Sequence, residues 1–231
     1  MISAATAMPM SETGPSLSRS WMKANVIAAA IYVAIGILTN ATDKLLGLDE
    51  STAGMLFRGI GSVIAFFGAV VPLVAYAMLT GPVLSEKLPA FSRRGWISLH
   101  ASIGVALGIA FAVVILFGPK SSGAPATMPS HQTMLIGGLV ATFVFGPMFG
   151  AIMGGLQTLV LRRAATGMLA WVLWSAVGST VLVALLMATA FGLGQNNGVA
   201  TFLAIEAVMF AGTVGSAVIM LPAVKRLAPR G

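Results

Sequence analysis

Six long apolar stretches constrain the fold of this chain more than any other feature. They cover residues 24–42, 59–80, 97–117, 133–161, 169–191 and 199–221. A helix needs about 20 predominantly apolar residues to cross the hydrocarbon core of a bilayer. The stretches therefore predict an all-α fold, namely a polytopic membrane bundle of six transmembrane helices.

The composition of the chain excludes a soluble globular protein. Hydrophobic residues make up 58% of the 231 residues and charged residues only 8%, whereas a soluble domain carries roughly a quarter charged residues. So few charges cannot cover a surface that faces water. The absence of cysteine also excludes disulfides, thiolate metal ligands and a cysteine nucleophile.

The positive charges lie mostly on one side of the predicted spans. Ten of the thirteen Lys and Arg residues fall there: Arg19, Lys23, Lys87, Arg93, Arg94, Arg162, Arg163, Lys225, Arg226 and Arg230. Lys44, Arg58 and Lys120 fall on the other side. The positive-inside rule then places both termini in the cytoplasm. We expect the spans to lie in a bacterial-type inner (plasma) membrane. Charges confined to the span ends predict the lipid bilayer as a partner and no nucleic acid, although the net charge is +7.

The chain divides into three predicted regions. Residues 1–23 are expected to form a flexible cytoplasmic tail, since the first twenty are rich in Ser, Thr, Ala and Pro. The six-span membrane domain covers 24–224, and a basic cytoplasmic tail covers 225–231. The four tryptophans fall at the predicted cytoplasmic span ends, where an indole ring favours the lipid–water interface: Trp21, Trp96, Trp171 and Trp174.

A weak internal similarity suggests a duplication. The third and fifth spans each begin with a Trp and a Gly and end in Phe-Gly, at residues 117–118 and 191–192. Each of these spans follows another across a cytoplasmic connection. The similarity therefore suggests a repeated hairpin, formed once by the second and third spans and again by the fourth and fifth.

Glycines recur at a spacing of four in two spans. The fourth span contains Gly146, Gly150 and Gly154, and the third contains Gly104 and Gly108. Such G-x-x-x-G faces let a second helix backbone approach closely, so we expect all five glycines at helix contacts. Pro147 lies within the same glycine run and predicts a kink in the fourth span.

Glu206 is the only acidic residue well inside a predicted span. A carboxylate in hydrocarbon is costly, so it should face the bundle interior, pair with another group or be protonated. Two interpretations follow. One is a proton or cation site. The other is a neutral carboxyl that bonds a hydroxyl of a neighbouring helix, for which Ser62, Thr142 and Ser179 lie at suitable depths.

Two more polar residues lie within spans near the cytoplasmic side. Gln157 is about a turn and a half before Arg162 and is expected to bond a neighbouring helix or a backbone carbonyl; the alternative is an inner gate or a ligand contact. His100 is expected at the interface. A bis-histidine haem is disfavoured because His131, the only other histidine, is expected on the opposite side of the membrane.

A methionine–histidine pattern opens the fourth span. Met128, His131 and Met134 would lie on one side of a helix, a donor set that suits Cu(I). Chance explains the pattern better, because the chain contains 14 methionines. We predict no bound metal and no cofactor.

Two functions remain open after these observations. The first is an accessory or structural subunit of an inner-membrane assembly, which packs through its glycine faces against other membrane subunits or itself. The second is a small transporter or channel for a solute, proton or cation that uses Glu206. An enzyme is disfavoured, since only Glu206 and His100 could perform acid–base chemistry and they lie at different depths.

Overall fold

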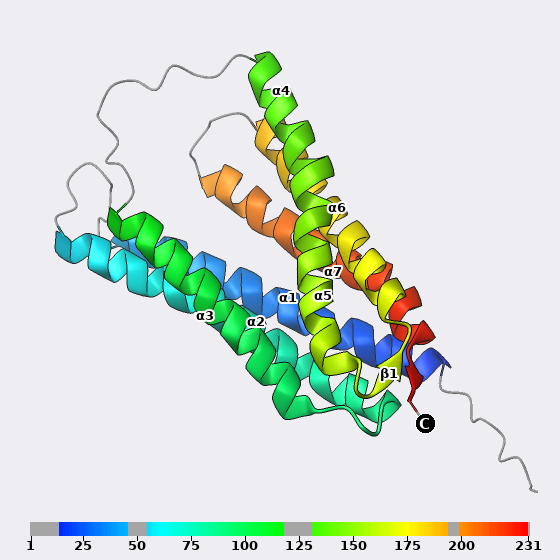
Figure 1. Cartoon of the computed structure of the whole chain (residues 1–231). Coiled ribbons are helices and arrows are strands. Elements are labelled where there is room, and N and C mark those ends of the chain that lie inside the picture. Colours follow the sequence, from blue (N-terminus) through cyan, green and yellow to red (C-terminus); the bar gives the residue numbers. More distant parts are fainter. Residues whose placement is uncertain (1–13, 46–54, 118–130, 194–198, 231) are drawn as a thin grey trace, which may run out of the picture.

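The computed structural model of the chain describes residues 14–45, 55–117, 131–193 and 199–230 (Figure 1). Almost all of these residues are helical, so the all-α prediction is confirmed. The helices are α1 (Gly14–Leu45), α2 (Met55–Lys87), α3 (Arg93–Phe117), α4 (His131–Val140), α5 (Gly146–Leu161), α6 (Met168–Leu193) and α7 (Val199–Arg226), with a π-helical turn η1 (Ala141–Phe145) between α4 and α5. Six helical segments are long and apolar enough to cross a membrane, which is consistent with an integral membrane protein.

The helix α4–η1–α5 changes its winding next to a proline. Its π-helical turn ends at Phe145, immediately before Gly146 and Pro147. Proline has no backbone N–H, and its ring clashes with the carbonyl of the preceding helical turn. A wider turn relieves both problems, and this is the form that the irregularity expected at Pro147 takes in the structure.

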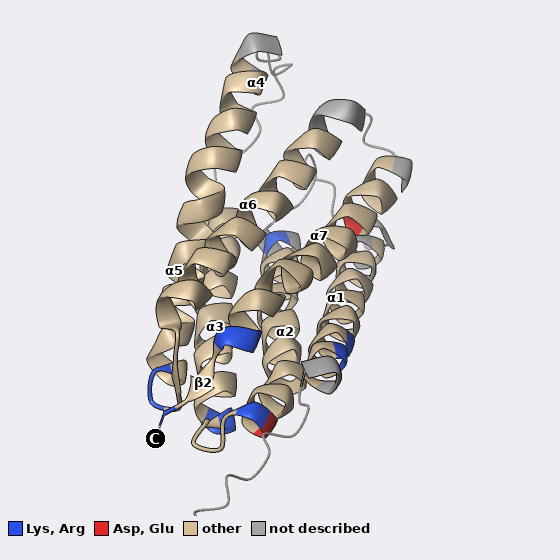
Figure 2. Ribbon diagram, turned by 90° about the vertical axis from the view of Figure 1, so that its right-hand side faces the viewer, with Lys and Arg blue, Asp and Glu red and all other residues tan. Residues whose placement is uncertain are grey.

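Lys and Arg residues gather at one end of the bundle, called the basic end here (Figure 2). Helices α1, α3 and α6 begin there, and α2, α5 and α7 end there. Two short strands, β1 (Ala165–Thr166) and β2 (Ala228–Pro229), pair antiparallel at this end. The Lys87 ammonium also donates to the carbonyls of Val224 and Lys225, at 2.6 and 2.7 Å. The segment after Lys225, which was expected to be a tail, is therefore tied to the bundle as far as Arg230.

The N-terminal part also differs from the expected tail. Helix α1 begins at Gly14, and Trp21 is only 1% exposed. The Trp21 indole N–H donates to the carbonyl of Ala217 in α7 at 3.1 Å. Residues 14–23 are thus part of the packed bundle, because this indole has an acceptor inside it. Residues 1–13 lie outside the described residues.

Three buried tryptophans recur at equal intervals along the chain. Trp21, Trp96 and Trp171 are spaced 75 residues apart along the sequence and lie near the starts of α1, α3 and α6. Each indole N–H donates to a helix that ends at the basic end, namely α7, α2 and α5. Each of these tryptophans thus joins the start of one helix to a helix that ends at the basic end. The duplicated hairpin stays a prediction.

The hydrophobic core is concentrated at the basic end. Its largest buried side chains are the three tryptophans with Leu84, Leu88, Leu161 and Leu227. Helix α3 and the α4–η1–α5 helix meet near this end and diverge towards the other (Figure 1). The opposite half of the bundle is consequently more loosely packed, and large apolar side chains such as Phe117 and Phe143 are exposed there.

Candidate functional site

Both glycine faces make contacts within the chain. A Cβ atom on Gly104 would lie 2.9 Å from the Val70 Cα atom of α2, and one on Gly108 would lie 3.2 Å from the Phe66 Cα atom. Distances this short leave no room for a side chain. The third-span glycines therefore hold α3 against α2.

The fourth-span glycines hold α5 and η1 against α6 in the same way. An added Cβ would lie 3.0 Å from the Thr180 Cα atom at Gly146, 2.7 Å from the Ala176 Cα atom at Gly150 and 3.1 Å from the Val172 Cα atom at Gly154. All five glycines thus meet helices of their own chain. They are covered there, and do not offer a free face to another protein.

His100 and Gln157 meet inside the basic end. The Gln157 Nε2 atom lies 3.1 Å from His100 Nε2, and the Trp171 indole N–H donates to Gln157 Oε1 at 2.8 Å. His100 Nδ1 lies 2.9 Å from the carbonyl oxygen of Trp96. The network joins α3, α5 and α6. It pairs every polar side-chain atom of His100 and the amide oxygen of Gln157.

The indole of Trp171 fixes the tautomer of His100. An indole N–H is a donor only, so the Gln157 oxygen must face it and the Gln157 amide nitrogen must face His100. The amide therefore donates to His100 Nε2, and the His100 proton lies on Nδ1, where it is donated to Trp96. Both ring nitrogens are occupied, which leaves neither free to bind a haem iron or another metal.

The network of His100, Gln157 and Trp171 at the basic end is buried. His100 is 0% exposed, and its ring lies 4.4 Å from the ring of Trp96 and 5.3 Å from that of Tyr76. His100 is therefore enclosed between helices; its depth near the membrane interface stays a prediction. Trp21, Trp96 and Trp171 are likewise enclosed, because each indole N–H has an acceptor on a neighbouring helix; Trp174 is partly buried.

Glu206 lies at the other end of the molecule, with one oxygen unpartnered. Its residue is 9% exposed, and its Oε2 atom is buried with no hydrogen-bond partner among the described residues. The carboxyl lies against Gly36 of α1, where an added Cβ would be 2.9 Å from the Glu206 Cδ atom. A glycine at that position lets the carboxyl approach the α1 backbone.

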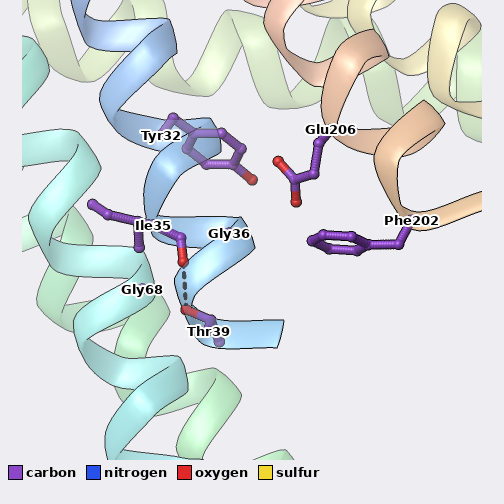
Figure 3. A pocket seen from close by; sticks show the side chains of 7 residues that line it. All are labelled: Tyr32, Ile35, Gly36, Thr39, Gly68, Phe202 and Glu206. Carbon is purple, nitrogen blue, oxygen red and sulfur yellow. Dashed lines mark hydrogen bonds between the residues drawn. The ribbon is translucent and has the colours of Figure 1, made fainter. Parts of the chain in front are cut away.

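A partly open cavity of about 280 Å³ surrounds this carboxyl. Helices α1, α2 and α7 line it with Tyr32, Ile35, Gly36, Thr39, Gly68, Phe202 and Glu206. The Tyr32 hydroxyl and the Phe202 ring flank the carboxyl (Figure 3). The Thr39 hydroxyl donates to the carbonyl of Ile35 at 2.8 Å. Within the described lining there is one carboxyl and no Lys or Arg.

The hydroxyl residues expected near Glu206 are elsewhere. Ser62 donates to the carbonyl of Gly59, Ser179 faces Gly150 and Thr142 belongs to η1. None of the three lines the cavity. The residues that do were missed because α1 and α7 are the first and last helices, and no local sequence pattern indicates that they pack together.

Glu206 and Gln157 do not share a site. Glu206 is nineteen residues before Lys225, or about 28 Å along α7, whereas Gln157 is five residues before Arg162, or about 7 Å along its helix. The cavity lining also includes neither Gln157 nor Pro147. The two polar groups therefore belong to separate regions, one at each end of the bundle.

The methionine–histidine pattern, a weak copper candidate for which we predict no bound metal, lies outside what the structure describes, since Met128 is outside the described residues, as are the side chains of His131 and Met134 in α4. The absence of a bound metal there stays a prediction. Comparisons with known protein families, with curated proteins and with solved structures find no match to this chain. The function is therefore argued from the two regions described above.

Proposed function

We propose that this chain is a membrane transport protein that binds a cation at Glu206. The observation that supports the proposal is the Glu206 Oε2 atom, which is buried in a membrane-type bundle without a hydrogen-bond partner among the described residues. An orphaned buried polar group lowers stability by about 1–3 kcal/mol, and a charged one costs more. A carboxyl that served only structure would be expected to have found a partner. Intramembrane carboxyls commonly mark ion or substrate pathways.

The accessory-subunit alternative loses its main support. That interpretation relied on glycine faces that dock other membrane proteins. The five glycines instead contact α2 and α6 of the same chain. An accessory role would have to use the remaining exposed surface, which is apolar and suited to lipid.

Electrical recording on reconstituted protein tests the proposal. Proteoliposomes adsorbed to a capacitive sensor are exposed to concentration jumps of protons, sodium, potassium and small ammonium ions. We expect a current for at least one cation in the wild type and none for Glu206→Gln, which keeps the side-chain shape but cannot ionise.

A matched carboxyl variant controls for a general charge effect. Glu86 is exposed near the end of α2 at the basic end, so Glu86→Gln should give the wild-type current. A wild type without current for any of these cations, or an undiminished current in Glu206→Gln, would overturn the transport proposal in favour of the accessory role.

We propose the orientation from the charge distribution: the protein lies in the inner membrane, and both of its termini lie in the cytoplasm. A reporter enzyme that is active only outside the cytoplasm should be active when fused after Gly123 and silent when fused after Arg163. The reverse pattern of activity would invert the orientation, and the Glu206 cavity would then lie in the cytoplasmic half.

A further inference from the structure

We infer that the Glu206 cavity binds a small alkylammonium cation. This inference deepens the transport function proposed above and rests on it. Three properties of the described lining support it: its single charge, its aromatic wall and its size.

The charge of the lining matches a monovalent cation. Glu206 supplies the one carboxyl, and no Lys or Arg of the described residues lines the cavity. Its Oε2 atom is free to accept a hydrogen bond or to face a positive charge. A single buried carboxylate balances one positive charge, so a monovalent cation would leave the occupied cavity neutral.

The walls favour an organic cation over a metal ion. The Phe202 ring and the Tyr32 hydroxyl flank the carboxyl (Figure 3). An alkylammonium group is attracted to the face of an aromatic ring such as that of Phe202. Ca²⁺ takes about six to eight oxygen ligands, and Mg²⁺ takes about six. Only three lining side chains carry oxygen, namely Glu206, Tyr32 and Thr39, and the Thr39 hydroxyl already donates to a backbone carbonyl.

The size of the cavity sets the size of the ligand. A volume of about 280 Å³ corresponds to about nine water molecules in the liquid. It lies just below the usual range for ligand pockets, about 300–1,000 Å³. A cation of a few heavy atoms, such as tetramethylammonium, fits this space.

Gly36 positions the carboxyl within these walls. The Glu206 carboxyl lies directly against the Gly36 backbone, and a methyl group there would overlap it. The carboxyl is the movable end of a side chain, so Gly36→Ala should displace it rather than separate the helices. This variant keeps the charge and both rings but misplaces the carboxyl.

Direct binding of radiolabelled tetramethylammonium to the purified full chain in mild detergent tests the inference. We expect saturable binding that an excess of unlabelled tetramethylammonium removes and an equal concentration of sodium chloride does not. Glu206→Gln should abolish binding. Phe202→Leu should weaken it about three- to thirtyfold, the range that one cation–π contact supplies.

Two control variants separate these effects from misfolding. Phe143→Leu removes an exposed phenylalanine of η1, and Gly215→Ala adds a methyl group in α7 where no atom lies within 4 Å. Both should bind as the wild type does, whereas Gly36→Ala should bind more weakly. Gel filtration of every variant confirms that the loss of binding is not a loss of fold.

The outcomes distinguish this inference from the proposed function. If tetramethylammonium does not bind but proton or sodium currents depend on Glu206, the ligand class is wrong and the transport function stands. If it binds with the expected dependence on Glu206 and Phe202 but no cation gives a current, the ligand class stands and transport is wrong. Binding that is equal in the wild type and Glu206→Gln overturns the inference.

Discussion

The two ends of this bundle differ in whether their buried polar groups have hydrogen-bond partners. At the basic end, both ring nitrogens of His100 and the amide oxygen of Gln157 have partners at hydrogen-bonding distance. At the other end, the Glu206 Oε2 atom has none among the described residues. Buried polar groups are normally paired, and an exception requires an explanation. The comparison teaches that burial and polarity alone do not identify a site; what matters is whether the group is already satisfied by the fold.

The density of packing also differs between the two regions. Three tryptophans and several leucines fill the basic end, whereas the Glu206 carboxyl borders a cavity. A closely packed network resists movement, and a cavity with an unpartnered group can accept a ligand without first breaking contacts. We therefore propose that the basic end serves stability and that the Glu206 region serves ligand binding.

The largest loss of stability is expected from a variant that disrupts the packing beside the basic end. Gly150→Leu would place a side chain where an added Cβ is already 2.7 Å from the Ala176 Cα atom. Because α5 and α6 would have to separate, we expect a loss of about 3 kcal/mol or more in the free energy of unfolding. Denaturation in mixed micelles measures this change in the free energy of unfolding.

The matched control uses a glycine of the same helix that has no neighbour. An added Cβ on Gly155 would have no atom within 4 Å, so Gly155→Leu should unfold at nearly the wild-type denaturant concentration. If Gly150→Leu is as stable as this control, the glycine face does not hold α5 against α6.

A smaller effect is expected from the polar network itself. Gln157→Leu leaves the Trp171 indole N–H without its acceptor and His100 Nε2 without its donor. We expect a loss of about 1–3 kcal/mol. Leu159→Ala is the control on the same helix, because Leu159 is exposed and does not belong to the network.

A double-mutant cycle sharpens this test. His100→Leu and Gln157→Leu each break the contact between the two side chains, so the double variant should lose less stability than the two single variants together. Additive losses would show that the two side chains are not coupled, and that the basic end does not depend on this network.

Much of the fold could be predicted from the sequence, because a membrane imposes a length and a polarity on every helix. The six apolar stretches predict six helices, and glycines at a spacing of four predict close contacts. The sequence does not tell which helix each glycine contacts. Nor does it distinguish an interfacial tryptophan from a buried one, since both positions lie at a helix end; only the acceptor on a neighbouring helix decides.

The candidate sites were less predictable because their residues are far apart in the sequence. Gln157 and His100 are 57 residues apart, and Tyr32 belongs to the first long helix whereas Glu206 belongs to the last. The cost of burying a carboxyl singled out Glu206, but its surroundings depend on α1 packing against α7.

The stability of Glu206→Leu tests the central claim most directly, because leucine keeps the bulk of the side chain and removes its polar atoms. Denaturation of this variant and the wild type in mixed micelles measures the change in the free energy of unfolding. If the carboxyl serves a ligand and not the fold, the variant should be as stable as the wild type or more stable by up to about 1 kcal/mol, since no protein partner is lost and an orphaned group is removed. A loss of stability as large as that of Gln157→Leu would show that Glu206 is a structural residue, and would contradict the distinction between the two ends.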